Sequence, residues 1–161
     1  EVTSLRRRQW SIEEPDVEAA ARRLREVGVA GDALDITARI DVGEAEEVGL
    51  RVRVGDGEAT TIGYAVGTTE VFVDRRRSGD VTFSHTFPGV YPAPLPLDDG
   101  VLDLRVLVDR SSVEVYAGDG RVVLTQQVFP DPDSIGVEVY AAGGATGATD
   151  LQIWELDPAA G

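Results

Sequence analysis

The sequence contains no cysteine, no methionine and no lysine, and only one histidine among its 161 residues. Without cysteine, disulfide bonds and thiolate metal sites are excluded, so the fold depends on its hydrophobic core. No apolar run approaches the roughly 20 residues that a membrane-spanning helix needs. The start of the chain, residues 1–4, also lacks the basic and apolar regions of a signal peptide. We therefore expect a mature or excised segment that does not cross a membrane.

Positive charge is scarce: 15 arginines stand against 29 Asp and Glu residues, which gives a net charge of −14. An acidic protein repels nucleic acid and anionic membrane surfaces, so neither is expected as a partner. A neutral ligand fits this charge better. At this length we expect a single domain, 1–161, that is large enough for a hydrophobic core.

One segment, 11–28, has the pattern of a helix. Ser11 and Glu14 are spaced as a capping box, Pro15 lies near the first turn, and Gly28 is a typical helix end. Between them, apolar residues recur at helical spacing: Val17, Ala20, Ala21, Leu24 and Val27. We predict a short amphipathic helix that packs on the rest of the fold and has no chemical role.

From Ala33 onward the hydrophobic period changes to two, which is typical of half-buried strands. Runs of this kind recur between glycine-rich turns, at 33–42, 48–54, 60–66, 70–74, 81–87, 102–109, 112–117, 121–129, 135–141 and 149–156. They predict an all-β fold, an antiparallel two-sheet sandwich or jelly roll over 33–157, rather than an α/β fold. The proline-rich stretch 88–100 is predicted to be an ordered extended loop, because proline disfavours regular pairing.

Two strand ends share the pattern Val-x-Val-Asp-Arg, one ending at Asp74 and Arg75 and the other at Asp109 and Arg110. After the second, strand alternation places a carboxylate and an aromatic ring on one face, at Glu114 and Tyr116. If these groups converge, carboxylate acceptors and guanidinium donors suit neighbouring sugar hydroxyls. The same Asp and Arg residues also fit structural salt bridges and turn caps. The residues alone leave both interpretations open.

Catalysis has little support in the sequence. His85, the single histidine, shares a face with Val81, Phe83 and Phe87, which indicates a core position, and no G-x-S-x-G nucleophile motif is present. Acidic residues are so numerous that chance carboxylate pairs are expected. Asp131 and Asp133 lack the spacing of an EF-hand loop and predict a turn. We expect no catalytic residue, no metal and no cofactor.

The string Leu-Arg-Val-Leu-Val-Asp-Arg-Ser-Ser-Val-Glu-Val-Tyr at 104–116 resembles the C-terminal β-sandwich module of glycoside hydrolase family 32, which includes invertases, levanases and inulinases. Further strings resemble the same module in the same order, at 4–6, 49–53, 62–64, 73–75, 78–79, 118–121, 128–130 and 151–156. The resemblance implies a sandwich similar to the concanavalin-like lectins, attached behind a catalytic five-bladed propeller. The absence of cysteine is consistent with a bacterial secreted protein, so we expect the parent enzyme to be secreted by a bacterium.

The family's catalytic Asn-Asp-Pro, Arg-Asp-Pro and Glu-Cys strings have no counterpart here, so we do not expect this chain to hydrolyse fructan. The sandwich is also similar to carbohydrate-binding module family 66, which binds fructans such as levan largely through terminal fructose, so we expect this chain to bind levan or inulin. By position, that resemblance points to a pocket formed by Asp74, Arg75, Asp109, Arg110, Ser111, Glu114 and Tyr116. The alternative is a structural module that binds no sugar and stabilises the propeller.

Overall fold

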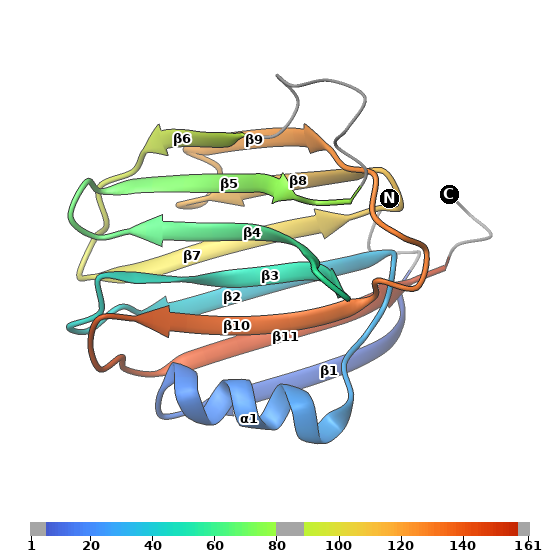
Figure 1. Cartoon of the computed structure of the whole chain (residues 1–161). Helices are drawn as coiled ribbons and strands as arrows, with labels where there is room; N and C mark the ends of the chain where they lie inside the picture. Colours follow the sequence, from blue (N-terminus) through green and yellow to red (C-terminus); the bar gives the residue numbers. More distant parts are fainter. Residues whose placement is uncertain (1–5, 80–88, 158–161) are drawn as a thin grey trace.

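The computed structural model describes residues 6–79 and 89–157, in which two antiparallel sheets face each other (Figure 1). The order of the six-stranded sheet is β1 (Arg6–Glu14), β11 (Thr149–Leu156), β2 (Leu34–Asp41), β7 (Val101–Val108), β8 (Ser112–Ala117) and β9 (Val122–Gln127). That of the five-stranded sheet is β10 (Gly136–Ala142), β3 (Glu47–Gly55), β4 (Glu58–Ala65), β5 (Glu70–Arg77) and β6 (Val90–Pro94). The predicted two-sheet sandwich is confirmed.

The hydrophobic core lies between the two sheets and follows the alternation of the sequence. In β7 and β8 every second residue is buried, and the intervening side chains are only partly buried. Tyr64 crosses the core with 1% exposure and donates its hydroxyl to the carbonyl of Leu95 at 2.7 Å. Since successive residues of a strand point to opposite faces, the polar half of each strand forms the outside of the sandwich.

The helix, α1 (Val17–Val27), begins later than predicted. Its N-cap is Asp16, whose side chain accepts from the Ala19 backbone at 2.8 Å, whereas Ser11 and Glu14 lie in β1. The expected capping box is therefore wrong: pairing of β1 along β11 outweighs a local capping signal. Gly28 ends the helix as expected, at φ 69. The helix packs against β10 and β1 at one edge of the sandwich (Figure 1).

The prediction of an unpaired loop over 88–100 is wrong in its first part, since β6 pairs with β5 through Pro92 and Pro94. The physical reason is position, because β6 is the edge of its sheet and one side of its backbone needs no partner. Proline, which lacks an N–H, is tolerated there. Leu95 then continues the contact by donating its N–H to the carbonyl of Thr69 at 2.8 Å.

The other predicted strands within the described residues are present, with shifted ends. β9 ends at Gln127 instead of 129, because the Phe129 N–H donates to the carbonyl of Ser78, next to the other sheet, at 3.2 Å. The predicted strand 81–87, with His85, lies outside the described residues. Within the described part of the chain, no helix is long and apolar enough to cross a membrane.

Candidate functional site

The seven predicted site residues lie in three separate places. Asp74 and Arg75 are at the end of β5, residues 109–111 form the turn between β7 and β8, and Glu114 and Tyr116 lie on β8. Val73 and Val113 are fully buried, so their neighbours Asp74 and Glu114 point out of the sandwich from different sheets. The expected convergence on one face is therefore wrong. Alternation predicts the two sides of a strand but not the sheet to which the strand belongs.

Three of the seven residues stabilise the turn itself. The Asp109 carboxylate accepts from the Arg110 backbone at 2.7 Å, and Arg110 pairs with Asp32 at 3.2 Å. The Ser111 carbonyl accepts from the N–H of Val128 at 3.0 Å. These contacts are those of a turn cap and a surface salt bridge, which is the structural alternative left open by the sequence.

Arg75 has contacts that link the two sheets at one edge. Its guanidinium donates to the carbonyl of Gln127 in β9 at 2.9 Å and to the hydroxyl of Tyr91 in β6 at 3.0 Å. The same group lies 4.9 Å from the centre of the Tyr91 ring. Arg75 and Asp74 are adjacent in the chain but point to opposite sides of β5, so they do not form one binding group.

Asp74 forms a two-pronged ion pair with Arg76 on the outer face of the five-stranded sheet. Arg76 donates Nε to one carboxylate oxygen at 3.0 Å and Nη2 to the other at 2.7 Å. Partial burial raises the pKa of Asp74, but the hydrogen bonds and charge of Arg76 outweigh burial and hold it below its usual value. The carboxylate is thus ionised and held in a fixed orientation.

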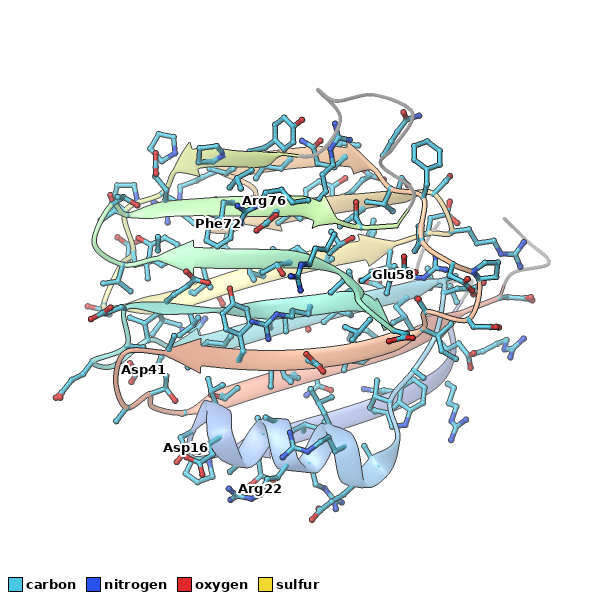
Figure 2. The ribbon with its side chains drawn as sticks, in the orientation of Figure 1. Asp16, Arg22, Asp41, Glu58, Phe72 and Arg76 are labelled. Atoms are coloured by element: carbon cyan, nitrogen blue, oxygen red, sulfur yellow. The ribbon has the colours of Figure 1, made fainter. Side chains whose placement is uncertain are left out.

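This ion pair borders a hollow of about 740 Å³, which we call the Asp74 hollow. Thr61 lies in the middle strand, between Arg51 of β3 and Asp74 of β5, and these three side chains are opposite one another in the strand register. The hollow extends to the β3–β4 turn and the end of β5, with its remaining lining at Gly55, Gly57, Glu58, Ala59, Arg76 and Arg77. Figure 2 shows Glu58 and Arg76 on the side of this sheet that faces the viewer.

An aromatic row lies beside the hollow. Strand pairing aligns Tyr140, Gly49, Gly63 and Phe72, in that order, across β10, β3, β4 and β5. A Cβ atom on Gly63 would meet the Phe72 ring and would lie 2.6 Å from the Tyr140 hydroxyl, and a Cβ atom on Gly49 would lie 3.0 Å from the Tyr140 ring, so the two aromatic side chains lie over bare glycines. Arg51 is 4.0 Å from the centre of the Tyr140 ring. The glycines thus let two aromatic side chains lie flat next to charged groups.

The Tyr140 hydroxyl donates to Glu47 at 2.5 Å, which fixes one end of this row. Burial, followed by this hydrogen bond to a carboxylate, raises the pKa of Tyr140 well above its usual value. The ring therefore stays neutral at any physiological pH. A neutral ring that is held in place offers an apolar surface with a polar margin.

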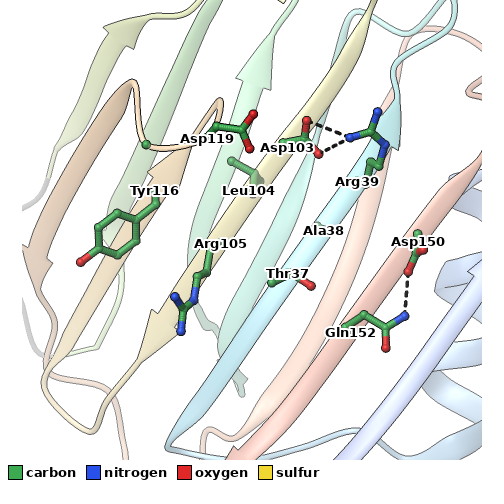
Figure 3. A pocket seen from close by; sticks show the side chains of 11 residues that line it. Thr37, Ala38, Arg39, Asp103, Leu104, Arg105, Tyr116, Asp119, Asp150 and Gln152 are labelled. Atoms are coloured by element: carbon green, nitrogen blue, oxygen red, sulfur yellow. Dashed lines mark hydrogen bonds and ion pairs between the residues drawn. The ribbon is translucent and has the colours of Figure 1, made fainter. Parts of the chain in front are cut away.

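Glu114 and Tyr116 share the outer face of the six-stranded sheet, as predicted, and the Tyr116 hydroxyl donates to the Glu114 carboxylate at 3.0 Å. This hydrogen bond raises the pKa of Tyr116. Tyr116 borders a hollow of about 530 Å³ that crosses four strands, which we call the Tyr116 trough (Figure 3). Its other walls include Arg39, Asp103 and Gln152. The trough and the Asp74 hollow are on opposite outer faces of the sandwich.

The family model described as "Glycosyl hydrolases family 32 C terminal" matches residues 1–155. The chain belongs to this family. It is 42% identical to a levanase of Bacillus sp. (strain L7) over 132 residues, which cover 80% of this chain and 14% of that protein. It is 42% identical to an extracellular exo-inulinase of Aspergillus awamori over 98 residues, which cover 60% of this chain and 18% of that protein.

The crystal structure of an exo-inulinase from Aspergillus awamori is similar to this family 32 domain, with a TM-score of 0.78 and 27% identity. The match covers 96% of this chain and 31% of that one. This domain therefore spans less than a third of the length of the relatives that it matches.

Sequence reasoning missed several residues of the Asp74 hollow and the aromatic row beside it: Arg51, Glu58, Thr61, Phe72 and Arg76. A signal was available, since isolated glycines at Gly49 and Gly63 interrupt two apolar strands and indicate a close approach of other groups. Moreover, three of the strings that resemble the family, 49–53, 62–64 and 73–75, lie on the adjacent strands β3, β4 and β5. Of these strings, Gly49, Arg51, Gly63 and Asp74 face outward, and other members, such as Leu50, Ile62, Tyr64 and Val73, are buried in the core.

No group of three or more potential metal ligands occurs among the described residues of this family 32 domain. The Asp131 side chain accepts from the Asp133 backbone at 2.9 Å, which is the turn that the sequence predicts.

Proposed function

We propose that this family 32 domain is a non-catalytic module that binds fructan through its terminal fructose at the Asp74 hollow. The observation that carries the proposal is the fixed ion pair of Asp74 and Arg76 in the wall of a hollow, beside the Phe72 and Tyr140 rings. The matched relatives bear the names of enzymes that act on levan and inulin. Of the seven residues predicted from the sequence, Asp74 is the one retained for this site.

The chemistry of the hollow suits vicinal hydroxyl groups. Asp74 and Glu58 supply carboxylate oxygens, and Arg51, Arg76 and Arg77 supply guanidinium N–H groups. Glu58 uses one oxygen, Oε1, for two protein hydrogen bonds, at 2.7 Å from the Asp131 backbone and 2.5 Å from the Ser134 hydroxyl. Its carboxylate is thereby anchored while the other oxygen makes no hydrogen bond with a described residue. Groups that are already oriented lose little entropy when a sugar binds.

The dimensions favour the end of a chain. Adjacent strands are about 4.8 Å apart, so Arg51, Thr61 and Asp74 together span roughly 10 Å. That width suits a terminal unit and its neighbour better than a long run of polymer. The β3–β4 turn also contributes to the lining through Gly55, Gly57 and Glu58, which closes one end.

Within a larger protein, the module would deliver a catalytic domain to its polymer. The family's catalytic strings are absent from this sequence, and the resemblance places them in a propeller elsewhere in the parent chain. Fructans are extracellular polymers, and one matched relative is named as an extracellular enzyme, so we place the parent protein outside the cell.

A second role, packing against that propeller, is favoured by apolar side chains on the surface. Val90 on β6 and Val123 on β9 are 43% and 52% exposed, and β6 and β9 are the edge strands at the same side of the sandwich (Figure 1). The two side chains point to opposite outer faces, since Val90 pairs with Asp74 and Val123 with Tyr116, so a propeller would have to wrap around this edge to cover both. Val90 lies opposite Asp74 in the strand register, so a propeller that covered Val90 would reach the Asp74 hollow, and the two roles compete for this part of the surface.

Titration calorimetry of the isolated domain with levan and inulin tests the proposal. We expect heat of binding at millimolar ligand for the wild type, and at least a tenfold loss of affinity at the Asp74 hollow in Asp74→Asn. Single sugar sites are weak because hydroxyls exchange water hydrogen bonds for protein ones. Glu18→Gln is the matched control, since it also removes the charge of an arginine-paired carboxylate but lies on α1.

Thermal unfolding of both variants shows whether the fold is intact. If no fructan gives heat with the wild type, the proposed function is wrong. If Asp74→Asn binds as well as Glu18→Gln, the hollow is not the site.

A further inference from the structure

We propose that the Tyr116 trough is a second carbohydrate site, so that one domain binds two fructan chains on opposite faces. This inference rests on the proposed function, because it assumes that fructan is the ligand. The trough crosses β8, β7, β2 and β11 on the outer face of the six-stranded sheet (Figure 3).

The trough exists because a short side chain lies between longer ones. Strand register aligns Gln152, Thr37, Arg105 and Tyr116 across the four strands. Thr37 forms the floor of this row, and the longer side chains stand on either side of it (Figure 3). The Asp74 hollow is built in the same way, with Thr61 as its floor. Two central strands thus each place a threonine below a polar hollow.

The cations of the trough are already paired. Arg39 binds both oxygens of Asp103, at 2.9 and 3.1 Å, and Arg105 binds both oxygens of Asp35, at 3.1 and 2.9 Å. Asp35 is fully buried although its strand position faces outward, so separating it from Arg105 would leave a buried charge without its partner. An anionic ligand would have to compete with Asp103 and Asp35 for these two cations, so a neutral ligand is favoured.

The remaining polar groups are mainly acceptors, which suits a ligand rich in hydroxyl donors. Gln9 donates to Gln152, and Gln152 donates to one oxygen of Asp150, at 3.1 and 2.9 Å. This relay fixes the amide and leaves the second Asp150 oxygen for a ligand. Asp119 lines the trough and makes no ion pair with a described residue. Across the trough from Asp150 and Gln152, Tyr116 adds a ring held by Glu114. Acceptors facing an aromatic wall are typical of sugar sites.

Two sites that face in opposite directions cannot hold neighbouring units of one short oligosaccharide. On a branched or long polymer they bind separate chains, and the second contact raises the overall affinity through effective concentration. The domain would therefore cross-link fructan chains as well as bind them.

The experiment uses three threonine-to-arginine variants of the whole domain. Thr37→Arg fills the trough from its floor, and Thr61→Arg fills the Asp74 hollow in the same way. Thr68→Arg is the matched control, because it lies in the exposed β4–β5 turn, away from both features. Calorimetry with a short fructo-oligosaccharide gives the number of sites per domain, and light scattering with levan measures cross-linking.

We expect two equivalents of oligosaccharide and an increase in scattering for the wild type and Thr68→Arg. Thr37→Arg and Thr61→Arg should each bind one equivalent and fail to cross-link levan, and the double variant should not bind. If the wild type binds one equivalent of oligosaccharide and Thr37→Arg also binds one, there is no second site, and the proposed function stands. No binding in the wild type overturns the proposed function and, with it, this inference.

Discussion

Arg53 in β3 donates a hydrogen bond from Nη1 to the backbone carbonyl of Arg110, at 3.1 Å, and so joins one sheet to the turn between β7 and β8 in the other. The same guanidinium donates to the carbonyls of Ser134 at 2.6 Å and Asp131 at 3.1 Å. Arg53 is only 2% exposed, and burial lowers its pKa. One side chain thus fixes two loops at this end of the sandwich, including the loop that anchors Glu58.

Replacing Arg53 with methionine should destabilise the domain by about 3 kcal/mol, because three carbonyls lose a charged donor. Urea unfolding measures this change in the free energy of unfolding. Arg39→Met is the control, since its ion pair with Asp103 is exposed and should contribute less than about 1 kcal/mol. Equal losses in the two variants would show that Arg53 is not a specific link between the loops.

Thr60 offers the opposite case, a buried polar group without a hydrogen bond. It is fully buried, and its hydroxyl oxygen has no partner among the described residues. Thr60→Val should therefore stabilise the domain by about 1 kcal/mol in urea unfolding. Thr61→Val, one position along β4 and partly exposed, should have almost no effect on stability. A loss of stability in Thr60→Val would mean that the hydroxyl is bonded.

The fold follows from local periodicity wherever one face of a strand is buried, as in β2, where Leu34, Ile36, Ala38 and Ile40 are at most 3% exposed. Prediction failed where a long-range contact decided the outcome. Ser11 is a good helix cap in isolation, but it lies opposite Gln152 in the sheet. No local pattern around residue 11 indicates a partner so distant in the chain.

In the candidate site too, relationships within one strand could be predicted and relationships between strands could not. The shared face of Glu114 and Tyr116 could be predicted, because both residues belong to one strand. The separation of Asp74 from Glu114 could not, since it depends on which sheet each strand joins. The contribution of Phe72 depends on Gly63 in the neighbouring strand, a relationship that appears only with the register.

Gly63→Ala should destabilise the domain by about 1 to 3 kcal/mol, because the new methyl group needs the space that the Phe72 and Tyr140 rings occupy. The rings would move and weaken the bond between Tyr140 and Glu47. Gly67→Ala is the control, since a Cβ there meets nothing within 4 Å, and its change should stay within about 0.5 kcal/mol. Urea unfolding of both variants measures the difference, and equal stabilities would contradict the close packing over Gly63.

The ion pair of Asp74 and Arg76 should make stability depend on pH in the acid range. The folded-state pKa of Asp74 is lowered, so its contribution is fully present above the unfolded-state value of about 3.9 and is lost as pH falls through the folded-state value. The stability difference between the wild type and Asp74→Asn should be constant from about pH 7 to 5 and shrink below about pH 4. Arg76→Gln removes the arginine that lowers the pKa of Asp74, so the loss of stability that Asp74 causes on acidification should be smaller in this variant. Urea unfolding across this range checks the sign, because a difference that grew on acidification would require a raised pKa.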